Sequence, residues 1–149
     1  MYLVSACLVG CPCRYNATSC ASEVVQRLVK EGKAVPVCPE QLASLPTPRE
    51  SCEIVFDESG NKKVVGRSGT DLTEAYTQAA TKTLAICKAL GINQAILKSK
   101  SPSCGSGQIY DGTFSGQTVA GDGLTAEELK RNGVRVMTEL EAESLILSL

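Results

Sequence analysis

The sequence contains no histidine and no tryptophan, and it has only two phenylalanines and four tyrosines. Without histidine, the chain lacks the most common general base, every Ser-His or Cys-His nucleophile pair and all imidazole metal ligands. Positive charge is not in excess either, because 15 Lys and Arg residues are balanced by 16 Asp and Glu residues. Nothing in the composition therefore requires a nucleic acid or an anionic membrane as partner.

Long apolar runs are also absent. No segment approaches the ~20 apolar residues of a membrane span, and the N-terminal residues have neither the basic region nor the apolar length of a signal peptide. We therefore expect a cytoplasmic protein without a membrane partner. With 149 residues, 43% of them hydrophobic and 21% charged, the chain is expected to form a single domain over residues 1–149.

Cysteine, in contrast, occurs eight times. In the reducing cytosol, so many cysteines indicate a bound metal or reactive thiols rather than structural disulfides. Any one of them could still act as a small buried apolar residue. Cys87 fits that interpretation best, because it lies on the apolar face of the longest predicted helix.

Short apolar runs alternate with segments of helical periodicity along the chain. Strands are predicted at residues 2–6, 34–37, 92–97 and 134–137, and a β-hairpin from residues 52–56 and 62–66. Helices are predicted at residues 22–31, 70–90, 125–132 and 139–147, with Ser22 and Thr125 as N-caps. Residues 105–123 are predicted to form a glycine-rich loop. This alternation predicts an α/β fold, a single-domain Rossmann-like parallel sheet flanked by helices, with the hairpin as an insertion or an edge.

Three of the cysteines stand at or shortly after the ends of predicted parallel strands, namely Cys7, Cys38 and Cys104. Open α/β sheets bind ligands at the carboxyl edge of their strands, so these three thiols could meet there. Three thiolates suit a soft metal or an iron–sulfur cluster. A cluster of four irons with three protein ligands leaves one iron open as a Lewis acid with high affinity for sulfur.

The other N-terminal cysteines, Cys11, Cys13 and Cys20, are ambiguous. Their spacing matches neither the paired Cys-x2-Cys of structural zinc sites nor the ferredoxin pattern. Two alternative functions therefore stay open. One is a zinc-stabilised binding module without catalysis, and the other is a thiol-redox or sulfur-carrier protein that uses one of these three thiols.

Candidate catalytic groups lie next to the same cysteines. Glu40 follows Cys38 by two residues, and in a chain without histidine a carboxylate is the natural proton carrier. It could equally be an ordinary acidic residue in the first turn of a helix. Ser101 and Ser103 precede Cys104 and could donate hydrogen bonds to sulfur or to a substrate, or simply shape a turn.

Three further residues are candidates for substrate binding. Lys98 could bind an anionic group of the substrate, although a lysine at a strand end is usually solvated. Tyr110 and Phe114 lie on the glycine-rich loop and could stack on a planar ring, or anchor the loop itself.

Several segments in this order resemble the TudS-type thiouracil desulfidase family. They are residues 5–10, 13–16, 37–42, 45–49, 97–98, 101–105 and 109–116. The resemblance implies a [4Fe-4S] cluster held by Cys7, Cys38 and Cys104, with Glu40 and Ser101 as catalytic residues. The implied reaction is the non-redox removal of sulfur from a thiolated pyrimidine (thiouracil, thiouridine or its nucleotide), which releases hydrosulfide and the oxo base.

The sequence departs from the family at Cys11, where an aliphatic residue is expected, and this leaves open whether Cys11 also binds a metal. Some relatives carry an added domain and act on thiolated tRNA. With a net charge of −1, we expect a free base, nucleoside or nucleotide as partner in preference to tRNA. The sequence leaves the oligomeric state open.

Overall fold

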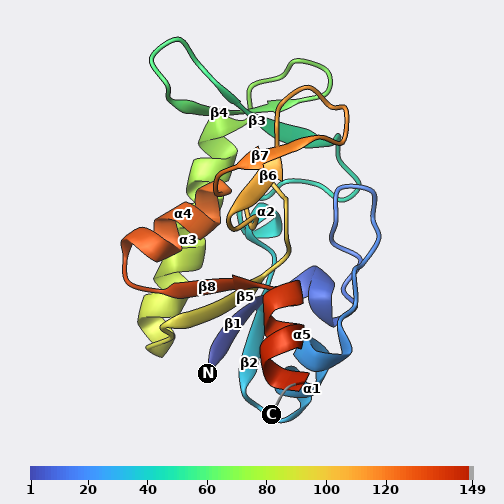
Figure 1. The fold of residues 1–149 in the computed structure, drawn as a ribbon, viewed down its shortest axis with the longest axis vertical. Coiled ribbons are helices and arrows are strands. Elements are labelled where there is room, and N and C mark those ends of the chain that lie inside the picture. Colours follow the sequence, from blue (N-terminus) through green and yellow to red (C-terminus); the bar gives the residue numbers. More distant parts are fainter. Residues whose placement is uncertain (148–149) are drawn as a thin grey trace.

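The computed structural model describes residues 1–147, and its centre is a fully parallel four-stranded sheet (Figure 1). The strand order is β2-β1-β5-β8, with bounds β1 (Tyr2–Ser5), β2 (Ala34–Val37), β5 (Gln94–Leu97) and β8 (Arg135–Thr138). Leu3 pairs with Val35 on one side and with Ala95 on the other. The predicted α/β fold with a parallel sheet is confirmed.

Helices cover both faces of this sheet. They are α1 (Glu23–Lys30) and α5 (Glu139–Leu147) on one face, and α3 (Thr73–Leu90) and α4 (Leu124–Arg131) on the other. Successive strand residues point to opposite faces, so Leu3 joins the core with α3 and α4 whereas Val4 joins the core with α1. Because both faces are buried, the two central strands β1 and β5 consist mostly of buried apolar residues, at 3–4 and 95–97. No helix within residues 1–147 has the length and apolarity needed to cross a membrane.

The predicted hairpin forms with the expected bounds, as β3 (Cys52–Phe56) and β4 (Lys62–Gly66). It is a separate two-stranded sheet at the top of the view in Figure 1, so it is an insertion and not an edge of the main sheet. Ile54 and Val64 of the hairpin pack with Tyr76 of α3 in a small core of their own.

The glycine-rich segment 105–123 contains a second hairpin, β6 (Gln108–Tyr110) and β7 (Thr118–Ala120), where the sequence predicts only a loop. Ile109 of β6 is 1% exposed and belongs to the same small core as β3 and β4. Burial of this one side chain compensates for the low strand propensity of the surrounding glycines, which is why the sequence pattern missed the strands.

Helix α4 begins one residue before the predicted start, and Gly123, not Thr125, is its N-cap. The Thr125 hydroxyl is buried and has no hydrogen-bond partner within residues 1–147, so its predicted capping role is wrong. A Cβ atom at Gly123 would lie 2.6 Å from the Ser103 carbonyl carbon and oxygen. The backbone N–H of Leu124 instead donates to Pro102 at 2.9 Å. The missing side chain therefore lets the start of α4 pack directly on the turn before Cys104.

Ser22 does occupy the N-cap position of α1, but its hydroxyl makes no capping hydrogen bond. It donates to the Glu143 carboxylate of α5 at 2.9 Å, so it links the two helices on this face of the sheet.

Two short helices lead the chain away from the carboxyl edge of the sheet. The first, η1 (Ala6–Val9), follows β1, so that strand ends at Ser5 rather than at residue 6. The second, α2 (Pro39–Leu42), follows β2 and begins with a proline, which needs no hydrogen-bond acceptor at that position. Cys7 lies within η1 and Cys38 directly precedes α2, so each of these two cysteines is close to the end of a strand.

Candidate metal centre and active site

A cavity of about 330 Å³ is lined by residues from the carboxyl edge of the parallel sheet and from both hairpins. Cys7 lies in it on η1, Cys38 immediately after β2, and Cys104 on the turn after β5. All three thiols are buried and free. Three cysteines that are distant in sequence thus contribute to the wall of one cavity, at the edge of the sheet where parallel strands end.

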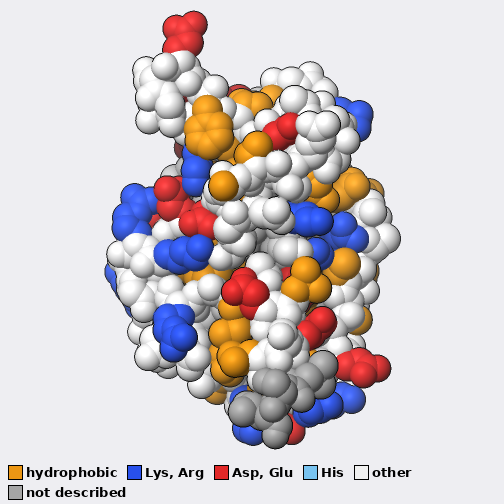
Figure 2. Space-filling model, in the orientation of Figure 1, with side chains coloured by type: hydrophobic (Ala, Val, Ile, Leu, Met, Phe, Trp, Pro, Cys, Tyr) orange, Lys and Arg blue, Asp and Glu red, His pale blue; other side chains and the backbone are white. Residues whose placement is uncertain are grey.

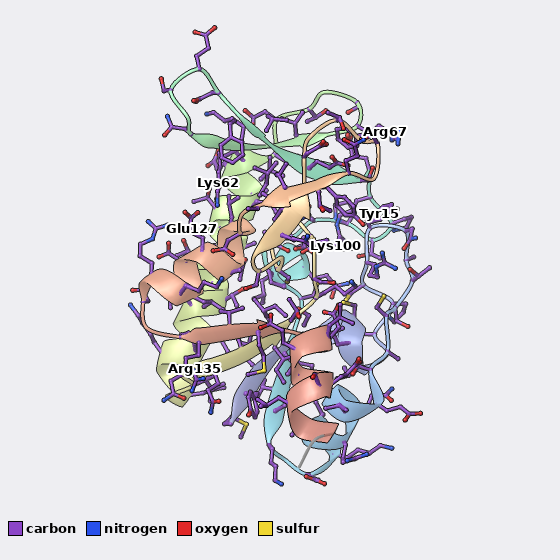
Figure 3. All side chains as sticks on the ribbon, viewed as in Figure 1. Tyr15, Lys62, Arg67, Lys100, Glu127 and Arg135 are labelled. Carbon is purple, nitrogen blue, oxygen red and sulfur yellow. The ribbon has the colours of Figure 1, made fainter. Side chains whose placement is uncertain are left out.

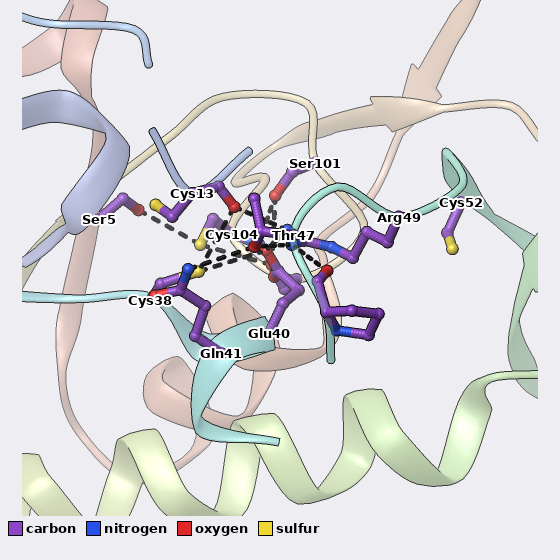
Figure 4. A network of polar contacts seen from close by, with 12 residues as sticks. Ser5, Cys13, Cys38, Glu40, Gln41, Thr47, Arg49, Cys52, Ser101 and Cys104 are labelled. Atoms are coloured by element: carbon purple, nitrogen blue, oxygen red, sulfur yellow. Dashed lines mark hydrogen bonds and ion pairs between the residues drawn. The ribbon is translucent and has the colours of Figure 1, made fainter. Parts of the chain in front are cut away.

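Cys104 has two hydroxyl neighbours. Its sulfur accepts a hydrogen bond from Ser5 at 3.3 Å (Figure 4), and the Ser103 hydroxyl oxygen lies 3.5 Å from it. Burial raises the pKa of the Cys104 thiol to about 12, and the Glu40 carboxylate adds to this effect while the two hydroxyl groups oppose it. The thiolate is the form that binds metal, so a metal that binds here must displace the proton.

Cys13 lies among these thiols, with hydrogen bonds to Cys7 and Cys38. The bond with Cys38 lowers the pKa of Cys13, but the bond with Cys7 and burial outweigh it, and the pKa is raised to about 12. The pKa of Cys38 is also raised, first by Cys13 and then by burial and Glu40. Cys13 therefore belongs to the same group of thiols in the cavity wall as Cys7 and Cys38.

The other two ambiguous cysteines, Cys11 and Cys20, are half-buried and pack against the core formed with α1. Within the described residues, neither is part of the cavity wall. Cys87 of α3 is 1% exposed in the core between this helix and the sheet, which agrees with its interpretation as a buried apolar residue.

The donor set of the cavity fits an iron–sulfur cluster in its chemistry, because soft thiol ligands from three strand ends are buried away from water. Within residues 1–147, no group of three or more Cys, Asp or Glu side chains is arranged to hold a single metal ion. Ligands of a [4Fe-4S] cluster are not expected to meet that condition, since each cysteine binds a different iron atom.

Glu40 lies in the first turn of α2, with a carboxylate oxygen 3.9 Å from the Cys38 sulfur. It forms an ion pair with Arg49 at 3.1 Å, and the two side chains are only 13% and 8% exposed. Its other oxygen accepts a hydrogen bond from Ser103. The sequence alone does not identify Arg49 as a functional residue, because only the fold brings it next to Glu40. The one sequence signal for Arg49 is its position in segment 45–49, one of the segments that resemble the desulfidase family.

Ser101 and Ser103 differ in what they contact. The Ser101 oxygen accepts a hydrogen bond from the backbone N–H of Cys104 at 2.7 Å, and this residue lies in the cavity wall. Ser103 is fully buried between Glu40 and Cys104 and is not part of the wall. The first hydroxyl is therefore placed toward a ligand and the second toward the protein, although both roles stay predictions.

Lys98 is in the cavity wall, but its ammonium group already has partners. It contacts the Glu139 carboxylate at 3.3 Å and the Ser99 hydroxyl at 3.0 Å. Glu139 also accepts hydrogen bonds from the Ser99 backbone and hydroxyl. Burial raises the pKa of Glu139, but the hydrogen bonds from Ser99 and the positive charge of Lys98 outweigh this effect and lower the pKa below its ordinary value. Glu139 of α5 thus holds Lys98 in place, a role that the sequence did not reveal.

Tyr110 and Phe114 both lie in the wall, on the loop side of the cavity. Phe114 has a positive φ of 56°, which is uncommon for a residue other than glycine. The buried Glu53 carboxylate of β3 accepts its backbone N–H at 3.1 Å, and the Arg67 guanidinium lies 5.4 Å from the centre of its ring. The first hairpin therefore holds this aromatic residue at the cavity.

Comparisons with known proteins agree with these features. Residues 2–141 match the model of the 2-thiouracil desulfurase family. The chain is 48% identical over 151 residues to the uncharacterized protein YbbK of Bacillus subtilis (strain 168), with 98% of this chain and 100% of that protein covered.

A solved structure is similar as well. It is described as the [4Fe-4S]-dependent thiouracil desulfidase TudS, and it superposes with a TM-score of 0.87 at 42% identity, covering 99% of this chain and 95% of that one. The resemblance that the motifs predict is thereby confirmed. This chain belongs to the 2-thiouracil desulfurase family.

Proposed function

We propose that this protein is a [4Fe-4S]-dependent desulfidase that hydrolyses the C–S bond of a thiolated pyrimidine, releasing hydrosulfide and the oxo base. The observation that carries the proposal is the convergence of Cys7, Cys38 and Cys104 on one cavity beside the Glu40 carboxylate, whose side chain is only 13% exposed. A solved relative with 42% identity is described as [4Fe-4S]-dependent and as a thiouracil desulfidase, which supports both the cofactor and the substrate class.

Cys7, Cys38 and Cys104 would hold the cluster. When bound, it supplies an open iron that attracts the substrate sulfur and withdraws electron density from the C–S bond. The hydroxyl group of Ser5 donates to the Cys104 sulfur, and such a donor favours the thiolate that a metal requires.

Glu40 acts as the general base in this proposal. Its carboxylate takes a proton from the water that adds to the ring carbon and passes this proton to the sulfur. As the C–S bond breaks, its electron pair leaves with the sulfur as hydrosulfide, and Glu40 takes the proton of the added hydroxyl group so that the C=O bond of the oxo base forms. Arg49 holds one carboxylate oxygen and Ser103 holds the other. The carboxylate is therefore oriented before the substrate arrives, which removes the cost of ordering it during the reaction.

Ser101 and the two loop aromatics orient the ring. The Ser101 oxygen accepts the backbone N–H of Cys104 and lies 3.4 Å from the Ser103 oxygen. In this proposal Ser101 donates its proton to a substrate atom in place of that long contact. Tyr110 and Phe114 supply flat apolar surface in the wall for stacking on the pyrimidine.

The charges at the cavity favour a nucleotide among the possible substrates. Arg14 and Arg67 line the cavity, and within residues 1–147 neither forms an ion pair with a carboxylate. Figure 3 shows Arg67 with Tyr15 and Lys100 on the same side of the molecule, and Figure 2 shows Lys and Arg side chains gathered in the middle of that face. A phosphate group would find positive partners here, which a free base cannot use.

The test is reconstitution of the full chain with iron and sulfide under anaerobic conditions, followed by assays with 2-thiouracil, 4-thiouracil and their nucleotides. We expect about four irons per chain, sulfide release and formation of the oxo base, with the nucleotide giving the highest kcat/KM. Protein without iron is the control. Iron-loaded protein that releases no sulfide from any of these compounds would overturn the proposal.

A further inference from the structure

We infer that Arg49 determines substrate specificity, by donating its Nε–H to the carbonyl oxygen that remains on a singly thiolated uracil ring. This inference rests on the proposed function and adds a residue that recognises the part of the ring that does not react.

The guanidinium of Arg49 is held by protein acceptors on one side. Its Nη1 donates to Pro46 at 3.2 Å and to Thr47 at 3.1 Å. Its Nη2 donates to the Cys13 carbonyl at 3.0 Å and to Glu40 at 3.1 Å. These bonds come from three separate segments of the chain, so the planar group cannot rotate freely.

The remaining donor of this group has no partner. Within residues 1–147, the Nε atom of Arg49 is buried and makes no hydrogen bond. Buried donors nearly always find an acceptor in native proteins, and an exception calls for an explanation. Arg49 belongs to the cavity wall, so a bound ligand can supply the acceptor.

The chemistry of the wall indicates which ligand atom this is. Glu40 and Glu53 place carboxylates at the cavity, and these suit the ring N–H groups of a pyrimidine but repel its carbonyl oxygen. A guanidinium N–H is a charged donor and binds a carbonyl oxygen well. With the thiocarbonyl directed to the cysteines, the second exocyclic oxygen of the ring is the acceptor that Arg49 lacks.

A site built to hydrogen-bond a substrate group discriminates strongly against an analogue without that group, because the donor then stays unpaired. The test uses two pairs of compounds in which the second member lacks the carbonyl and, with it, one ring N–H. They are 2-thiouracil with pyrimidine-2-thione, and 4-thiouracil with pyrimidine-4-thione. The intrinsic reactivity of each pair differs, but that difference cancels when variants are compared by their preference ratio in kcat/KM.

We expect wild-type protein to prefer the carbonyl-bearing compound by roughly 100-fold or more, and Arg49→Lys to lose at least ~10-fold of that preference. Arg27→Lys is the matched control, because Arg27 is exposed on α1 and lies outside the wall of the described cavity, so the preference should stay at the wild-type value. Iron content and the visible absorption of the cluster are measured for each variant, so that loss of the cofactor is not mistaken for loss of specificity.

An Arg49→Lys variant that loads iron and keeps the wild-type preference overturns the inference but leaves the proposed function intact. If this variant fails to fold or load iron, binding of uracil, pyrimidin-2-one and pyrimidin-4-one to wild-type protein decides the matter by calorimetry. Equal affinity for all three overturns the inference, and weaker binding of at least one pyrimidinone supports it. The proposed function fails separately, if iron-loaded wild-type protein releases no sulfide.

Discussion

The parallel sheet and the two hairpins contribute different parts of one cavity. The sheet places Cys7, Cys38 and Cys104 at or just beyond its strand ends, in a layer that helices cover on both faces. The hairpins contribute Arg67 and the loop that carries Phe114, and they share one small core. In our proposal the chemistry therefore depends on the most buried layer, and recognition of the ring depends on a smaller unit beside it.

The two regions meet at the Glu40–Arg49 pair. Glu40 extends from the sheet side, on α2, and Arg49 lies just before β3. Their ion pair thus connects the proposed base to the region proposed to recognise the substrate. Substitutions in the sheet should remove iron or turnover, and those in the hairpins should change substrate binding alone.

The largest effect is expected for the three sheet cysteines. Cys7→Ser, Cys38→Ser and Cys104→Ser should each abolish stable iron binding, because a hydroxyl is a far poorer ligand for iron than a thiolate. Anaerobic iron analysis after reconstitution measures this. Cys20→Ser is the matched control, since Cys20 is half-buried and outside the wall of the described cavity. Full iron content in all three variants would contradict the ligand assignment.

Glu40→Gln should leave the iron content unchanged and slow turnover by roughly 100-fold or more, the usual range for loss of a general base. The amide keeps the size of the side chain but cannot take a proton. Sulfide release under saturating substrate gives kcat. Glu58→Gln, at an exposed position between β3 and β4, serves as the control. Wild-type kcat in Glu40→Gln would reduce Glu40 to a structural acid.

A smaller effect is expected on the hairpin side. Phe114→Ala should raise KM by roughly 3- to 10-fold, the range of a lost aromatic contact, while iron content and kcat stay close to wild type. Tyr110→Ala should act in the same way. Phe56→Ala is the control, because Phe56 belongs to the first hairpin but is 54% exposed. Unchanged KM in both wall variants would rule out ring stacking.

The smallest effect concerns stability on the sheet side. The pKa of Glu139 is lowered in the folded protein from its ordinary value of 4.5. Its carboxylate therefore stabilises the fold at pH values above 4.5, and this stabilisation is lost as the pH falls through the pKa of the folded state. Glu139→Gln should therefore reduce the free energy of unfolding by about 1–3 kcal/mol at neutral pH. The difference from wild type should shrink below pH 4.5.

Denaturant unfolding of both proteins across this pH range measures the effect. Glu74→Gln, at an exposed position on α3, should show no comparable loss. A destabilisation by Glu139→Gln that is the same at all pH values would show that packing, rather than charge, accounts for the role of Glu139.

Elements whose signals are local could be predicted well. The hairpin 52–66 and the helix ending at Gly91 follow from alternation, helical periodicity and a terminating glycine within a few residues. The strands β6 and β7 could not be predicted, because they depend on the burial of Ile109 against residues that are distant in sequence, such as Ile54 and Val64. Thr125 has the residue type of a cap, but close packing of Gly123 on Ser103 decides where α4 begins.

The sequence by itself determined the α/β order and the position of a cysteine after each of three strands. Both follow from short-range patterns and from the rule that parallel strands end at one edge. Only the tertiary structure decided that Arg49 pairs with Glu40, that Ser103 faces the carboxylate while Ser101 faces the cavity, and that Glu139 holds Lys98. The physical reason is that charge pairing in a buried site depends on distances between segments, and no local pattern along the chain encodes them.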